Sequence, residues 1–136
     1  MSRARLPAAV RDAIVRHARL EAPRECCGFL IGRRGRVQFA LPTKNVARQP
    51  TVRYEIDSWE HVRLRRWLRR FQPPLEILGV YHSHPNGKAF PSEADRAEAN
   101  YPRWLFVIAG GPGRRTVVRS FRIVRGLVRR VGGAGV

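Results

Sequence analysis

Two histidines, His82 and His84, stand at the end of a continuous apolar run that begins at Leu75. Such a run is typical of a buried strand, in which side chains two residues apart point to the same face. Both imidazoles can therefore share one cation, and Asp95, one turn into a helix expected to start at Ser92, can add a carboxylate oxygen. Two imidazoles and one carboxylate leave a fourth position for water, which is the pattern of a catalytic zinc site.

Each half of this pattern also has a simpler explanation. The segment from Ser92 to Asp95 fits a capping box, in which a serine caps a helix and an acid three residues later bonds back to it. The pair His82 and His84 alone fits two surface residues at a strand end. The combined spacing, however, is expected by chance with a probability of only about 10⁻⁴ to 10⁻³ in a chain of this length. We therefore favour the metal site, and Ser92 can cap the same helix.

The chain resembles the JAMM (MPN-plus) metallopeptidases in these residues and in a segment further upstream. Residues 25–28, which precede an apolar run, match the Glu-x-x-Gly strand of that family. Residues 53–57 are similar to the small bacterial members, and the resemblance extends over roughly residues 6–124. All five positions of the family signature are intact: Glu25, His82, His84, Ser92 and Asp95.

The resemblance implies one Zn²⁺ per chain, bound by His82, His84 and Asp95. It also implies that Glu25 holds the zinc-bound water, the nucleophile, and takes its proton, and that Ser92 donates a hydrogen bond to the tetrahedral oxyanion. The reaction implied is zinc-dependent hydrolysis of a peptide or isopeptide bond at the C-terminal tail of a ubiquitin-like sulfur-carrier protein. General acid–base help of the kind assigned to Glu25 is worth about 10²–10⁴ in rate.

The apolar periodicity predicts an α/β protein, a single mixed-sheet domain flanked by helices, and the resemblance implies the cytidine-deaminase-like JAMM/MPN fold. We expect this domain over residues 1–124 and a flexible C-terminal tail over residues 125–136. The second helix should bury Trp59, Val62, Trp67, Leu68 and Phe71. The predicted helices cover residues 6–20, 57 or 58 to about 71, and a short stretch from 92; the predicted strands cover 26–31, 37–41, 52–56, 75–82, 104–109 and 115–124.

The composition is strongly basic, with 27 Lys and Arg against 10 Asp and Glu and a net charge of +17. The cations are scattered, and the sequence has no helix-turn-helix, zinc-finger or ribonucleoprotein motif, so we expect no specific nucleic-acid partner. A basic nucleic-acid-binding module and a catalytically idle interaction scaffold remain the alternatives. No apolar run approaches the roughly 20 residues of a membrane span. We expect a cytoplasmic protein with no membrane partner, in which the adjacent Cys26 and Cys27 stay reduced.

Overall fold

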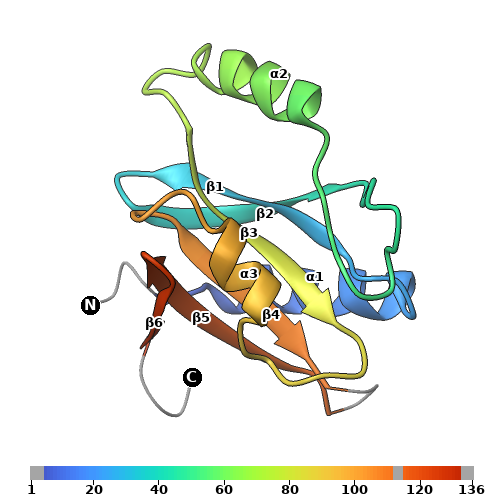
Figure 1. Ribbon diagram of the computed structural model, residues 1–136. Helices are drawn as coiled ribbons and strands as arrows, with labels where there is room; N and C mark the ends of the chain where they lie inside the picture. Colours follow the sequence, from blue (N-terminus) through green and yellow to red (C-terminus); the bar gives the residue numbers. More distant parts are fainter. Residues whose placement is uncertain (1–4, 112–114, 133–136) are drawn as a thin grey trace.

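The described part of the computed structural model, residues 5–111 and 115–132, forms one six-stranded sheet flanked by three helices (Figure 1). The elements in chain order are α1 (Ala8–Glu21), β1 (Cys27–Arg33), β2 (Arg36–Thr43), α2 (Ser58–Leu68), β3 (Glu76–His84), α3 (Glu93–Glu98), β4 (Leu105–Gly110), β5 (Val117–Val124) and β6 (Leu127–Val131). The strand order across the sheet is β2-β1-β3-β4-β5-β6. The predicted mixed α/β architecture is confirmed.

One strand pair sets the position of the third helix. The strands β3 and β4 run parallel, whereas every other neighbouring pair is antiparallel. A parallel pair needs a crossover connection, and the crossover from β3 to β4 contains α3. The helix therefore begins shortly after the carboxyl end of β3, where the two histidines lie.

The two faces of the sheet bury separate clusters of side chains. On one face, Val10 and Ile14 of α1 pack with Tyr81 of β3. On the other face, Leu68 of α2 packs with Val80 of β3 and with residues of β1, β4 and β5. Since successive residues of a strand alternate between faces, the side chains at positions 80, 82 and 84 lie on the face opposite α1.

The structure corrects the predicted strand over residues 52–56, which forms a turn and loop. Backbone amides that a strand would pair with a neighbouring strand are used locally. The N–H groups of Val52 and Arg53 donate to the carbonyl of Gln49, and the N–H of Glu55 donates to the side chain of Asn45. The segment is thus held by its own loop.

The buried face expected for the second helix is also partly wrong. The helix ends at Leu68, which is buried, and Phe71 is half-buried, but Trp59, Val62 and Trp67 are exposed. Leu68 packs on the sheet, whereas Trp67 contacts the ring of Phe71, with centroids 5.0 Å apart, and stays largely open to solvent.

The tail expected after residue 124 differs from the structure in residues 127–131, which form β6 and pair with β5. Arg125 and Gly126 both have positive φ, of 53° and 77°, which is the backbone of a tight hairpin turn. Residues 133–136 of the expected tail lie outside the described residues, and the expected domain boundary stays a prediction. None of the described helices is long and apolar enough to cross a membrane.

Candidate active site

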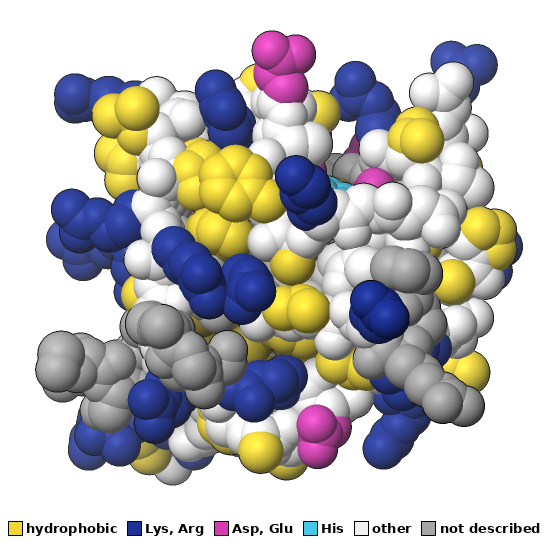
Figure 2. Space-filling model, turned by 90° about the horizontal axis from the view of Figure 1, so that it is seen from below, with side chains coloured by type: hydrophobic (Ala, Val, Ile, Leu, Met, Phe, Trp, Pro, Cys, Tyr) yellow, Lys and Arg dark blue, Asp and Glu magenta, His cyan; other side chains and the backbone are white. Residues whose placement is uncertain are grey.

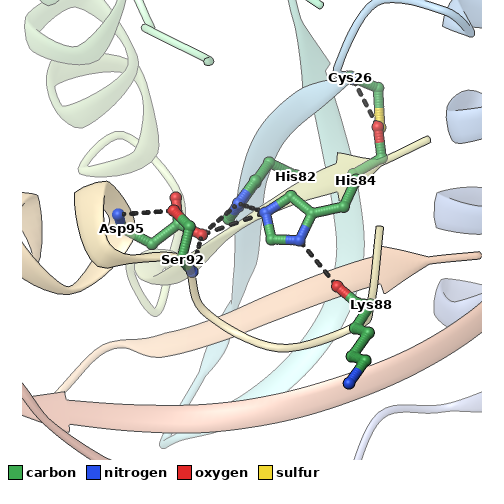
Figure 3. Close-up of polar contacts among 7 residues, drawn as sticks. Cys26, His82, His84, Lys88, Ser92 and Asp95 are labelled. Carbon is green, nitrogen blue, oxygen red and sulfur yellow. Dashed lines mark hydrogen bonds and ion pairs between the residues drawn. The ribbon is translucent and has the colours of Figure 1, made fainter. Parts of the chain in front are cut away.

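Three side-chain atoms converge at the carboxyl end of β3 (Figure 3). The Nε2 atoms of His82 and His84 are 3.1 Å apart, and Asp95 Oδ2 lies 3.1 Å from the first and 3.2 Å from the second. His82 is 3% exposed, and the side chains of His84 and Asp95 are each 13% exposed. The expected placement of both imidazoles on one face, with the carboxylate facing them, is what the structure contains.

Asp95 is held by the first turn of α3. Its backbone N–H donates to Ser92 Oγ at 3.0 Å, and the Ser92 N–H donates to Asp95 Oδ2 at 2.9 Å, so the capping box is complete. The capping box and the convergence of Asp95 on the histidines therefore coexist. The same arrangement fixes Ser92 beside the site.

Glu25 reaches the same place from the residues before β1. In the sheet Cys27 lies opposite His82, and Glu25, two residues earlier, is 5% exposed. Its backbone N–H donates to the Pro50 carbonyl at 2.7 Å, and its carbonyl accepts from Asn45 Nδ2 at 3.0 Å. Ligand-type atoms of Glu25, His82 and His84 all lie within 4.8 Å of one another. These three residues are placed to bind a metal ion.

The loop after β3 selects the tautomer of His84. The Nδ1 atom lies 2.8 Å from the carbonyl oxygen of Lys88, which can only accept, so Nδ1 carries a proton and Nε2 is the nitrogen that faces His82 and Asp95. The loop is itself fixed, because the Gly111 N–H donates to the Gly87 carbonyl at 2.8 Å and the Gly87 N–H donates to the His84 carbonyl at 3.1 Å. The sequence could not reveal this partner of His84, because it is a backbone carbonyl, which every residue carries.

Tyr54 is a second neighbour that the sequence did not identify. Its ring stacks on the ring of His82, with centroids 4.3 Å apart and an interplanar angle of 23°. It is held by the loop that Asn45 organises, since Asn45 Nδ2 also donates to the carbonyl of Arg53 at 2.9 Å. Tyr54 therefore restrains the orientation of His82.

The surroundings shift the pKa values of the two carboxyl groups of the site in opposite directions. Burial raises the pKa of Glu25 to about 7, the charge of His84 opposing and that of Asp95 adding to the rise. Burial also works to raise the pKa of Asp95, but hydrogen bonds from His82, His84 and the Ser92 N–H outweigh it and hold this pKa well below its usual range. Burial lowers the pKa of His82, which favours its neutral, metal-binding form.

The donor set fits a divalent transition metal. Two neutral imidazoles and one carboxylate are common zinc ligands, and two ligand atoms on a tetrahedral zinc lie about 3.3 Å apart. The observed separations of 3.1 to 3.2 Å among His82, His84 and Asp95 are close to that value. Glu25 offers a further carboxylate oxygen within 4.8 Å of the ligand-type nitrogens of both histidines.

A comparison with known families agrees with this geometry. The model of the prokaryotic homologues of the JAB domain matches residues 7–124. The chain therefore belongs to this family, which confirms the resemblance drawn from the five signature positions.

Two curated relatives are similar over most of their length. The desampylase of Haloferax volcanii is 38% identical over 121 residues, which cover 85% of this chain and 86% of the relative. The CysO-cysteine peptidase of Mycobacterium tuberculosis is 37% identical over 122 residues, which cover 86% of this chain and 80% of the relative. Both names are those of enzymes that cleave a bond.

Solved structures support the fold. The solution structure of a protein from Desulfitobacterium hafniense superimposes with a TM-score of 0.80 at 28% identity, covering 92% of this chain and 87% of that chain. A JAB1/MPN domain protein from Archaeoglobus fulgidus superimposes with a TM-score of 0.55 at 16% identity, covering 83% of each chain, and shows likeness of fold alone. The predicted JAMM/MPN fold is confirmed.

Proposed function

We propose that this chain is a zinc-dependent hydrolase that cleaves a peptide or isopeptide bond at the C-terminal tail of a ubiquitin-like sulfur-carrier protein. The observation that carries the proposal is the convergence of His82, His84 and Asp95 at one point with the buried Glu25 beside it. We expect one Zn²⁺ per chain, held by the two imidazoles and the Asp95 carboxylate. Zinc supplies a Lewis acid that can lower the pKa of a bound water from about 15.7 to about 7.

Glu25 is the proposed general base and acid. A buried carboxyl whose pKa is about 7 can accept a proton from the attacking water near neutral pH and return it to the leaving amine. Its backbone is pinned at both the N–H and the carbonyl, so the carboxyl group is held in place before substrate binds. A proton acceptor of this kind contributes about 10²–10⁴ in rate.

The remaining residues position the ligands and the substrate. Lys88 keeps His84 in the tautomer that presents Nε2, and Tyr54 stacks on His82. Ser92 Oγ accepts from the Asp95 N–H, which leaves the hydroxyl proton free to donate to the oxyanion of the tetrahedral intermediate. We assign Ser92 this role.

The proposed substrate class follows from the relatives. One of them is named a desampylase and another a CysO-cysteine peptidase, and the chain covers most of each. Because the second name states a bond between CysO and cysteine, the CysO protein with an attached cysteine is the first substrate to test. We place the enzyme in the cytoplasm, which fits two free, buried cysteines, Cys26 and Cys27.

The test combines metal content with cleavage. Protein purified without a histidine tag should contain about one zinc per chain by mass spectrometry, and His84→Ala should lose both the metal and turnover. The CysO protein extended by a C-terminal cysteine should lose the mass of one cysteine when incubated with the parent protein. A parent protein that binds no zinc after reconstitution, or that leaves this carrier and other extended carrier tails intact, would overturn the proposal.

A further inference from the structure

A groove of about 580 Å³ next to the proposed active site is lined by cations without acidic neighbours. Its charged lining residues are Lys88, Arg115, Arg119 and Arg130. No described residue of the groove is acidic, and none of these four cations pairs with a carboxylate in the described ranges. We call this surface the basic groove. Another cavity, around Arg53, contains Glu98, which pairs with Arg53 at 3.4 Å, so its charge is internally balanced.

The basic groove also carries exposed apolar side chains. Phe90 is 51% exposed and Val117 is 39% exposed, and Phe90 packs edge-on against Phe121 with centroids 5.4 Å apart. Figure 2 shows Lys and Arg side chains beside exposed hydrophobic ones on one face of the molecule, where few acidic side chains are seen. Arginine together with aromatic residues is the composition of protein–protein interfaces. A nucleic acid would use the cations of the groove for its phosphates but would not need the exposed apolar side chains beside them.

The groove lies against the loop that holds a proposed metal ligand. Lys88 is one of the residues that line the groove, and its carbonyl accepts from His84 Nδ1 at 2.8 Å. Phe121 belongs to the same buried cluster as Val80, so this part of β5 faces the side of the sheet on which His82 and His84 lie. A folded partner seated in the groove would therefore have a flexible tail within reach of the active site.

We propose that the basic groove docks an acidic and apolar surface on the folded body of the carrier protein whose tail is cleaved. This inference rests on the proposed function and adds to it the partner surface that the enzyme recognises. Complementary charge would speed the encounter, and Phe90 would supply the apolar anchor. The enzyme would then recognise the folded body of the carrier as well as its tail. An isolated tail peptide lacks that body, so its binding would not depend on the groove.

The decisive experiment uses a paired charge reversal, Arg119→Glu with Arg130→Glu. Arg16→Glu with Arg36→Glu is the matched control, because it changes the net charge equally at exposed positions on α1 and β2. Binding of the CysO protein is measured by titration at 150 mM salt. We expect Kd to rise about tenfold for the groove variant and for Phe90→Ala, and to change less than twofold for the control. Circular dichroism and thermal unfolding establish that each variant is folded.

Cleavage separates this inference from the proposed function. With the carrier–cysteine adduct, the groove variant should lose about tenfold in kcat/KM, whereas a synthetic peptide of the carrier's last eight residues plus cysteine should be cleaved within twofold of the parent rate. A parent that binds the carrier but cleaves neither substrate would contradict the proposed function alone. The docking site would be overturned if the groove variant and the control bound the carrier equally, or if the parent did not bind the carrier. Binding of a single-stranded RNA is measured on the same variants. A groove variant that lost RNA binding but kept carrier binding would also overturn the docking site.

Discussion

Replacing Glu25 by glutamine should stabilise the metal-free protein while removing its activity. The side chain is 5% exposed, and burial raises its pKa to about 7, above the 4.5 of an ordinary glutamate. The folded state therefore binds the Glu25 proton more tightly than the unfolded state does. As the pH rises from 4.5 to 7 the unfolded chain gives up this proton first, so the free energy of unfolding falls over that window.

The size of the effect follows from the two pKa values. The penalty for ionising Glu25 is absent below pH 4.5 and grows to about 3 kcal/mol above pH 7. Glutamine has the same shape and no proton to lose. The free energy of unfolding of Glu25→Gln should therefore exceed that of the parent by about this amount at pH 8 and equal it at pH 4. For a domain of this size that is a rise in Tm of roughly 10 °C.

The assay is thermal unfolding of EDTA-treated protein between pH 4 and pH 8, with Glu76→Gln, at an exposed position of β3, as the control. In the zinc-loaded protein the same Glu25→Gln change should keep the metal and lower kcat by about 10²–10⁴-fold. Parallel stability curves for Glu25→Gln and the parent would show that Glu25 titrates normally. Parent-level turnover in Glu25→Gln would refute its role as the base.

Three further changes test the surroundings of the site. Ser92→Ala should lower the free energy of unfolding by about 1 kcal/mol through the lost helix cap, and lower kcat by about 10²-fold. Ser92→Thr should restore both quantities. An unchanged kcat in Ser92→Ala would contradict the role of Ser92 at the oxyanion. Gly110→Ala places a Cβ against the backbone N of Ala89, so the loop must shift and zinc affinity, measured by chelator competition, should fall about tenfold. Zinc affinity equal to that of the parent would show that the loop geometry is dispensable. Burial raises the pKa of Cys26 to about 12 and that of Cys27 to about 11, so iodoacetamide at pH 8 should label neither in the folded protein and both in urea, and labelling of the folded protein, read by mass spectrometry, would contradict their burial.

Patterns confined to a few residues were predicted well. The hairpin from β1 to β2, the buried run that becomes β3 and the helix that begins after Ser92 all lie where the sequence places them. Each is fixed by local physics: turn residues, strand alternation and side-chain capping. The errors fall where residue composition indicates one structure and the contacts made in the fold decide another. Residues 52–56 have the composition of a strand but are held by Asn45 and Gln49 of their own loop. Trp59 and Trp67 are of a residue type common in cores but are exposed on α2.

The sequence by itself determined which residues can do the chemistry. The spacing of His82 and His84 follows from the two-residue period of a strand, and that of Ser92 and Asp95 follows from the geometry of a helix start. For Glu25 the residues alone gave no role, and the family resemblance singled it out. Only the tertiary structure decided how these pieces meet: the register of β1 on β3 brings Glu25 to the histidines, and the loop packed on β4 aims a backbone carbonyl at His84. Strand register and loop packing depend on which surfaces the whole chain can bury together, and a short stretch of sequence does not contain that information.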